Sequence, residues 1–100
     1  MRRSLTKGKG TFTYMDKAAV KHGNNMATDF YSFCVLASEV LSGHCIPVIP
    51  HLDALMERQN PTIPEKVPKE LRTCLMSGFE ENQEKRSNWK DTIIALRKFS

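Results

Sequence analysis

The segment from Thr28 to Gly43 has the pattern of a buried helix with marked ends, and it constrains the fold more than any other part of the chain. Thr28 suits an N-cap, Asp29 suits the first turn, and Gly43 suits the position just after the last turn. Within this segment, Glu39 is the only charged residue after Asp29. Apolar residues recur at the spacing of one helical face, namely Phe30, Phe33, Cys34, Ala37, Val40 and Leu41. We therefore expect a helix over 29–41 that is buried on most sides and forms the centre of an all-α fold.

Shorter helices are predicted around this segment, and no stretch alternates as a strand does. Pro68 suits the first position of a helix that Gly78 ends, and Asn88 suits the N-cap of the last helix. The acidic stretch 80–84 is expected to be a loop. The expected shorter helices cover 17–21, 52–58, 68–77 and the end of the chain from about 88, where Trp89, Ile93, Leu96 and Phe99 should point inward.

Length and composition favour one domain, residues 1–100, in an intracellular protein. The hydrophobic share of 40% and the mean hydropathy of −0.43 suit a modest core. No apolar run approaches the roughly 20 residues that span a bilayer, and residues 1–5 lack the apolar region of a secretory signal. Three cysteines at irregular spacings indicate reduced thiols. We expect a cytoplasmic location and no membrane partner.

The basic charge is confined to residues 1–22. Six basic residues and Asp16 give this segment a charge of +5, whereas the nine basic and ten acidic residues of the remainder give −1. Such a segment suits a phosphate-binding arm on nucleic acid or membrane, or a solvated segment without a partner. No aromatic stacking platform or helix-turn-helix pattern accompanies the charge, so a nucleic-acid partner is not favoured.

Five motifs, taken in order, resemble the C-terminal lobe of a protein kinase domain. They are residues 10–15 (Gly-Thr-Phe-Thr-Tyr-Met, like the end of an activation segment), 28–33 (Thr-Asp-Phe-Tyr-Ser-Phe, like the start of the central F helix), 61–64 and 68–71 (like the approach to helix H), and 84–89 (like the segment before the last helix). The style is most similar to the tyrosine-kinase-like branch of serine/threonine kinases. The resemblance implies that 1–22 end an activation segment and that 23–100 form a helical C-lobe.

The same resemblance implies roles for individual residues. Asp29 would cap the backbone of the catalytic loop, and Thr11 would contact the catalytic aspartate. Ser4 and Thr6 fall where activation-loop phosphorylation often occurs. Arg86 would be buried and paired with the glutamate of the Ala-Pro-Glu motif.

Several positions depart from the kinase pattern and suggest a diverged or pseudokinase-like copy. Asp-Lys-Ala (16–18) stands at the Ala-Pro-Glu position, and no glutamate occurs between residues 1 and 38. Removing one partner of a buried ion pair costs about 3–5 kcal/mol. We therefore expect Arg86 to be solvated or the segment to pack differently. The other departures are Cys34 for glycine, Ser38 for tryptophan, Gly78-Phe79 for Cys-Trp and Ser87 for proline.

The parts of a kinase that hold ATP do not occur in this sequence. It has no glycine-rich phosphate loop, strand lysine, His-Arg-Asp loop or Asp-Phe-Gly metal site. We expect no catalytic residue and no cofactor in this chain, with ATP and Mg²⁺ bound only by a complete parent kinase. His44, Cys45 and His51 have no fourth ligand nearby, so a zinc site is not favoured.

Three interpretations follow. The chain is part of a kinase or pseudokinase and pairs with the N-terminal remainder of that domain. Alternatively, it is a stand-alone, non-catalytic module that docks a protein partner through residues 44–60. Thirdly, it is an unrelated helical protein that binds nucleic acid through 1–22. Under the first interpretation, one face of helix 29–41 together with Tyr14 and Met15 should be exposed, apolar and prone to self-association.

Overall fold

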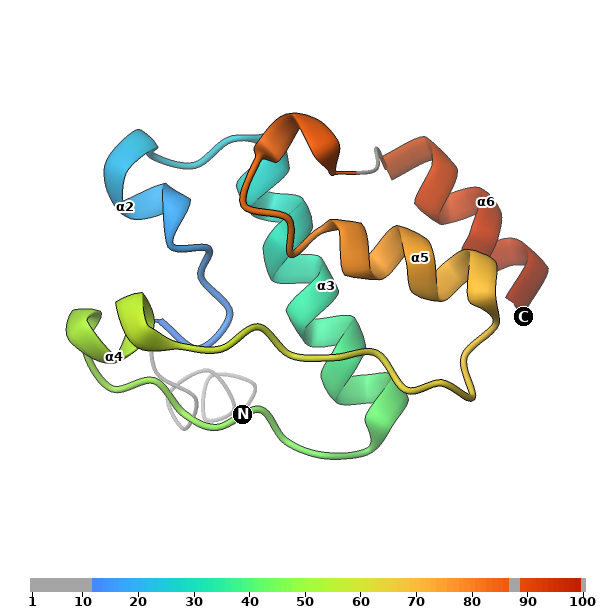
Figure 1. Ribbon diagram of the computed structural model, residues 1–100, viewed down its shortest axis with the longest axis horizontal. Helices are drawn as coiled ribbons and strands as arrows, with labels where there is room; N and C mark the ends of the chain where they lie inside the picture. Colours follow the sequence, from blue (N-terminus) through green and yellow to red (C-terminus); the bar gives the residue numbers. More distant parts are fainter. Residues whose placement is uncertain (1–11, 87–88, 100) are drawn as a thin grey trace, which may run out of the picture.

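A computed structural model describes residues 12–86 and 89–99, apart from the side chain of Phe99. Every regular element in these ranges is helical (Figure 1), which confirms the predicted all-α class. The elements are α2 (Ala18–His22), α3 (Met26–Ser42), α4 (Leu52–Glu57), α5 (Lys69–Ser77), the 3-10 helix η1 (Gln83–Lys85) and α6 (Trp89–Phe99). The predicted N-cap Asn88 and the inward position of Phe99 lie outside the described residues.

The central helix α3 begins earlier than the sequence predicted, because Asn25 rather than Thr28 is its N-cap. The Asn25 side chain accepts a hydrogen bond from the Thr28 backbone N–H at 2.9 Å. In return, the Thr28 hydroxyl accepts one from the Asn25 N–H at 2.8 Å. This reciprocal capping box satisfies two backbone donors at the helix start. The other end is as predicted, since Gly43 is left-handed (φ 76°) and donates its N–H to the Glu39 carbonyl.

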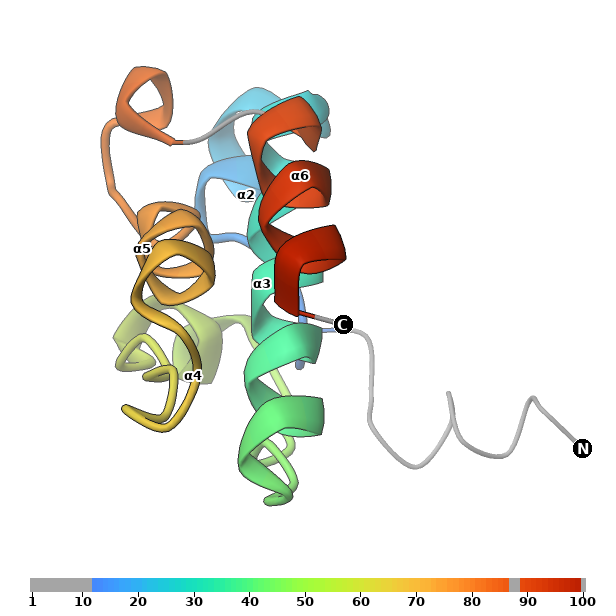
Figure 2. The same cartoon turned by 90° about the vertical axis from the view of Figure 1, so that its right-hand side faces the viewer.

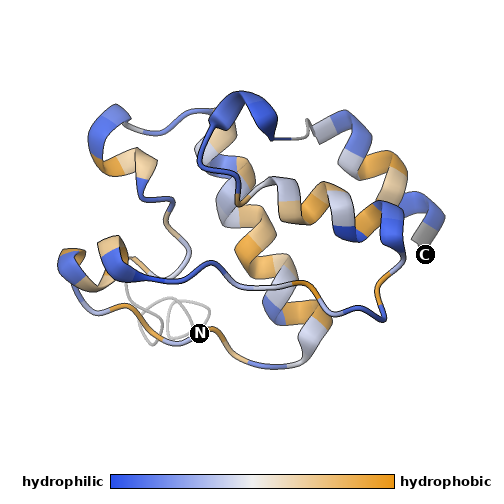
Figure 3. Ribbon diagram, viewed as in Figure 1, coloured by the Kyte–Doolittle hydropathy of each residue, from blue (hydrophilic) through white to orange (hydrophobic). Residues whose placement is uncertain are grey.

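Helix α3 lies in the middle of the fold, and the connection before α5 and helices α5 and α6 pack on one side of it (Figures 1 and 2). The Trp89 ring of α6 meets the Phe30 and Phe33 rings of α3 at centroid distances of 5.2 and 5.1 Å, so Trp89 packs on the core as expected. Figure 3 shows the hydrophobic residues concentrated along these three helices. The buried cluster comprises Phe30, Tyr31, Cys34, Val35, Ile63, Val67, Leu71, Leu75, Phe79 and Ala95.

The buried side of α3 agrees with the predicted one except at Val40. Val40, expected inside, is 70% exposed, whereas Tyr31 and Val35 are buried. Met26 and Leu36 are also exposed, so an apolar strip of Met26, Leu36 and Val40 remains uncovered by described residues. A helix that is apolar on most sides does not specify which sides its neighbours cover.

Tyr14 and Met15 do not share this exposure. Both are half-buried, and Tyr14 packs against the core while its hydroxyl donates to the Glu39 carboxylate at 2.5 Å. The expectation that these two residues join an exposed surface is therefore wrong. Their segment folds back onto α3 and covers part of it.

Helix α5 ends before Gly78 as predicted. A glycine is needed at this position because of the limited space around it, and not because of its backbone conformation. Gly78 has ordinary helical angles (φ −64°, ψ −17°). A Cβ atom added there would lie 2.5 Å from the Cys34 sulfur, and Cys34 is fully buried, which raises the pKa of its thiol to about 12. At the other end of α5, Pro68 is the N-cap instead of the first helical residue.

None of the helices in the described ranges has the length and apolar character needed to cross a membrane.

The contact between Gly78 and Cys34 predicts a conditional effect of one methyl group. Gly78→Ala should lower the free energy of unfolding by about 1–3 kcal/mol, because the core is overpacked at this contact. In a Cys34→Ala background the same substitution should cost clearly less, since the sulfur is gone and only the tight contacts with the residue 34 Cβ at 3.1 Å and the Leu75 carbonyl oxygen at 3.2 Å remain. Urea unfolding of the four proteins measures both effects. An equal loss in both backgrounds would show that the Cys34 sulfur does not determine the glycine.

Candidate functional site

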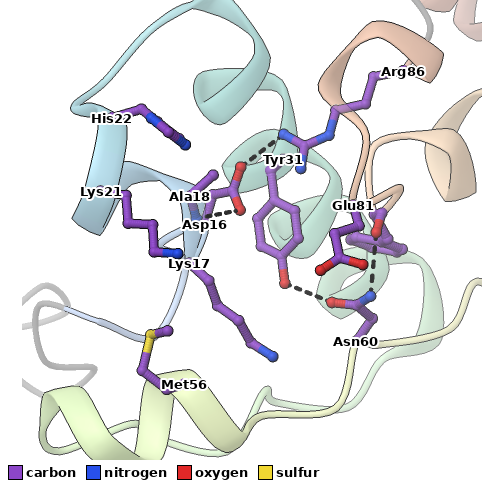
Figure 4. A pocket seen from close by; sticks show the side chains of 11 residues that line it. Asp16, Lys17, Ala18, Lys21, His22, Tyr31, Met56, Asn60, Glu81 and Arg86 are labelled. Atoms are coloured by element: carbon purple, nitrogen blue, oxygen red, sulfur yellow. Dashed lines mark hydrogen bonds and ion pairs between the residues drawn. The ribbon is translucent and has the colours of Figure 1, made fainter.

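Five polar residues from distant parts of the chain converge beside the N-terminal half of α3. We call them the arginine–tyrosine cluster: Asp16, Tyr31, Arg58, Asn60 and Arg86. Asp16 precedes α2, Tyr31 lies on α3, Arg58 and Asn60 follow α4, and Arg86 follows η1. Figure 4 shows four of them, with Asp16, Asn60 and Arg86 around the Tyr31 ring. The cluster therefore joins segments that lie far apart in the sequence.

The strongest interaction in the cluster is a buried ion pair. Arg86 Nη1 lies 2.7 Å from Asp16 Oδ2, and the two side chains are only 4% and 5% exposed. The second carboxylate oxygen of Asp16 accepts a hydrogen bond from the Ala18 N–H at 3.1 Å. One carboxylate thus shapes the start of α2 and neutralises a buried guanidinium. Hydrogen bonds of this charged kind are among the stronger ones in proteins.

Arg86 makes further bonds that compensate for its burial. Its Nη1 also donates to the Ala27 carbonyl at 2.8 Å, and its Nε donates to the Glu80 carbonyl at 2.9 Å. Of the two alternatives expected for Arg86, the solvated one is therefore wrong, because the side chain is buried and Asp16 supplies the carboxylate. The sequence held a signal for this pair, since Asp16 is the only acidic residue before Asp29.

The Tyr31 ring lies between two guanidinium groups. Arg58 Cζ is 5.6 Å and Arg86 Cζ is 5.5 Å from the ring centre, within the range of a cation–π interaction. The Tyr31 hydroxyl accepts a hydrogen bond from Arg58 Nη2 at 3.1 Å and donates one to Asn60 Oδ1 at 2.9 Å. Burial raises the pKa of Tyr31 above its ordinary value of 10.0, although Arg58 opposes this shift. The hydroxyl therefore stays protonated and remains a donor at neutral pH.

Arg58 and Asn60 extend the cluster to the surrounding backbone. Arg58 donates to the carbonyl of Thr13 and, at 2.8 Å, to that of Met15. Asn60 donates to the Phe79 carbonyl at 3.2 Å. The cluster thus binds backbone carbonyls that precede α3 in the chain and one that follows it. This arrangement favours a positioning role over a reactive one. The positioning role of Tyr31, Arg58 and Asn60 was not predicted from the sequence, because nothing in their local segments indicates that they converge.

A cleft of about 440 Å³ opens beside the cluster (Figure 4). Both members of the ion pair, Asp16 and Arg86, line the cleft together with Tyr31. Lys17, Lys21 and His22 lie on the α2 side, and Glu81 lies on the opposite side. Ala18, Met56, Asn60 and Phe79 complete the lining. The cleft therefore combines charged, hydrogen-bonding and apolar groups within the volume range of small-molecule sites.

The other residues singled out in the sequence lie elsewhere. Asp29 is exposed in the first turn of α3 and does not line the cleft. Ser4, Thr6 and Thr11 lie outside the described residues.

The residues considered for zinc are also accounted for. His51 is the N-cap of α4, where its Nδ1 accepts a hydrogen bond from the Ala54 N–H at 3.2 Å. His44 and Cys45 are exposed. Within the described ranges, no group of three or more histidine, cysteine, aspartate or glutamate residues could hold a metal ion.

Comparison of the chain with models of known protein families, with curated proteins and with solved structures found no match.

The double use of the Tyr31 hydroxyl predicts a large effect for a small change. Tyr31→Phe should lower the free energy of unfolding by about 1–3 kcal/mol, because the hydroxyl of this buried residue is a shared partner of Arg58 and Asn60. Tyr14→Phe removes the other tyrosine hydroxyl, which belongs to a half-buried residue and donates to Glu39. It should therefore cost less. Urea unfolding of both variants gives the comparison, and equal losses would contradict a special role for the cluster.

Proposed function

We propose that this chain is a diverged, helical C-terminal subdomain of a protein kinase-like domain. The complete parent would transfer a phosphoryl group from ATP to serine or threonine with Mg²⁺. This chain would carry neither the nucleotide site nor the catalytic loop. Its role would be to support the remainder of the domain and to contact protein partners.

The ion pair between Asp16 and Arg86 carries this proposal. The resemblance requires an acidic residue at the end of the activation segment to meet an arginine just before the last helix. The two residues are 70 positions apart in the sequence and meet in a buried contact. The acidic residue is an aspartate two positions before Ala18, so the contact supports the proposal while the motif itself has diverged.

A second contact also supports the proposal. The resemblance places a glycine at position 34 and a Cys-Trp pair at 78–79, whereas this chain has Cys34, Gly78 and Phe79. The Cys34 sulfur occupies the space that a side chain at Gly78 would need. Phe79 keeps an aromatic ring there and meets the Tyr31 ring edge-on at 5.5 Å. Two departures that looked independent in the sequence therefore compensate for one another in space.

The exposed strip on α3 fits the same proposal. Met26, Leu36 and Val40 are 71%, 47% and 70% exposed, and Asp29 is exposed on the same helix. The resemblance assigns Asp29 to the backbone of a catalytic loop. An apolar strip that contains such an acidic group suits another protein segment better than water.

The alternative is a stand-alone, non-catalytic binding module of pseudokinase type. The observation that favours it is the exposed apolar set of Val48, Leu52 and Met56, which lies within the predicted docking segment 44–60. These side chains could contact a protein partner without any remainder of a kinase domain.

The size of the native product separates the two possibilities. An antibody against residues 80–100 should detect a protein much heavier than 11.4 kDa in the source cell. Peptide mapping of that product should find a kinase catalytic loop before the segment of this chain. A heavy product without kinase motifs would contradict the kinase proposal. A product of 11.4 kDa would contradict the subdomain proposal and favour the stand-alone module.

A further inference from the structure

The α2 side of the cleft presents positive charge without an ion-pair partner among the described residues. Lys17 is the N-cap of α2 and Lys21 lies in its last turn, and both side chains line the cleft (Figure 4). Neither lysine takes part in the ion pairs of Arg86 with Asp16 and of Lys98 with Glu70 among the described residues. Both lysine ammonium groups are therefore available to a ligand.

The remaining charges in the cleft make its two sides electrostatically different. Arg86 and Asp16 neutralise one another at 2.7 Å, so they add little net charge. His22 adds donor capacity on the lysine side. The only other charged residue in the lining is Glu81, which lies on the opposite side (Figure 4). An anion is thus attracted to the α2 side and repelled from the Glu81 side.

The apolar part of the lining indicates that the ligand is more than an anion. Met56, Phe79 and the Tyr31 ring share the cleft with the lysines. The volume of about 440 Å³ lies within the usual range for sites that hold organic ligands. An inorganic phosphate ion would occupy only part of that volume and leave these side chains uncovered.

We propose that this cleft binds a phosphate monoester attached to an uncharged organic group. A phosphate monoester carries a charge of about −1.5 to −2 and three strong acceptor oxygens, which matches two ammonium groups better than a single carboxylate does. The organic group would pack on the apolar part of the lining, which is formed by Met56, Phe79 and the Tyr31 ring. This proposal is independent of the kinase relation and uses only the lining of the cleft.

Titration with phenyl phosphate, followed by the backbone amide signals of the labelled chain, tests the site. We expect shifts at residues that line the cleft and a dissociation constant on the order of a millimolar. A Lys17→Gln, Lys21→Gln double variant should bind about tenfold more weakly, because both ammonium groups are lost. The matched control Lys66→Gln, Lys90→Gln removes the same charge from exposed positions outside the cleft. It should change the affinity by less than about twofold.

A second variant tests the proposal with the opposite sign. Glu81→Gln removes the repulsive carboxylate and should strengthen binding by about two- to threefold. Equal weakening in the cleft variant and the control would overturn the site. Phosphate ion binding as tightly as phenyl phosphate would overturn the organic part of the proposal. Benzoate binding as tightly would overturn the phosphate part.

One further arm identifies the source of the monoester. A short glycine-flanked phosphotyrosine peptide that binds more tightly than phenyl phosphate would indicate a phosphorylated protein side chain. Weaker binding of the peptide would indicate a small molecule. Both outcomes support the site, whereas loss of all binding to monoesters contradicts it.

Discussion

The segments that meet at the start of α3 depend on one buried ion pair, that of Asp16 with Arg86. A buried charge that loses its partner is costly, so each segment that contributes to the pair is confined to one arrangement. Through its additional bonds to the Ala27 and Glu80 carbonyls, Arg86 connects the start of α3 with the chain after α5. Asp16 connects the same point to α2. Burying such a pair is favourable only when its geometry and remaining hydrogen bonds are nearly complete, and both conditions hold for Arg86.

The same pair places the two sides of the cleft. Lys17 directly follows Asp16, and Lys21 lies four residues further along the chain. On the other side, Glu81 directly follows Glu80, whose carbonyl accepts a hydrogen bond from Arg86. The charge separation across the cleft is therefore a consequence of the structural contact beneath it. Tyr31 strengthens this arrangement because its ring meets both guanidinium groups. In this account the cluster holds the cleft in shape, and the lysines outside the cluster would contact the ligand.

Local features of the chain were predictable from the sequence, because they depend on neighbouring residues. The spacing of apolar side chains gave the approximate helices, and Gly43 marked the end of α3 because a left-handed residue is needed there. The start of α3 was misplaced because Asn25 and Thr28 can both cap a helix, and a capping box with threonine at its third position lacks the usual glutamate. The outward position of Val40 was not predictable, since it depends on where α5 and α6 pack. The partner of Arg86 was missed because the motif directed attention to a glutamate at position 18.

A double-mutant cycle between Asp16 and Arg86 tests the central claim most directly. The free energies of unfolding of the original chain, Asp16→Asn, Arg86→Gln and the double variant would be measured in urea. Each single change should lower the free energy of unfolding by about 3–5 kcal/mol, because one buried charge loses its partner. The double variant should cost little more than either single change. Additive losses, or single losses below about 1 kcal/mol as in an exposed pair, would contradict the claim that this contact organises the fold.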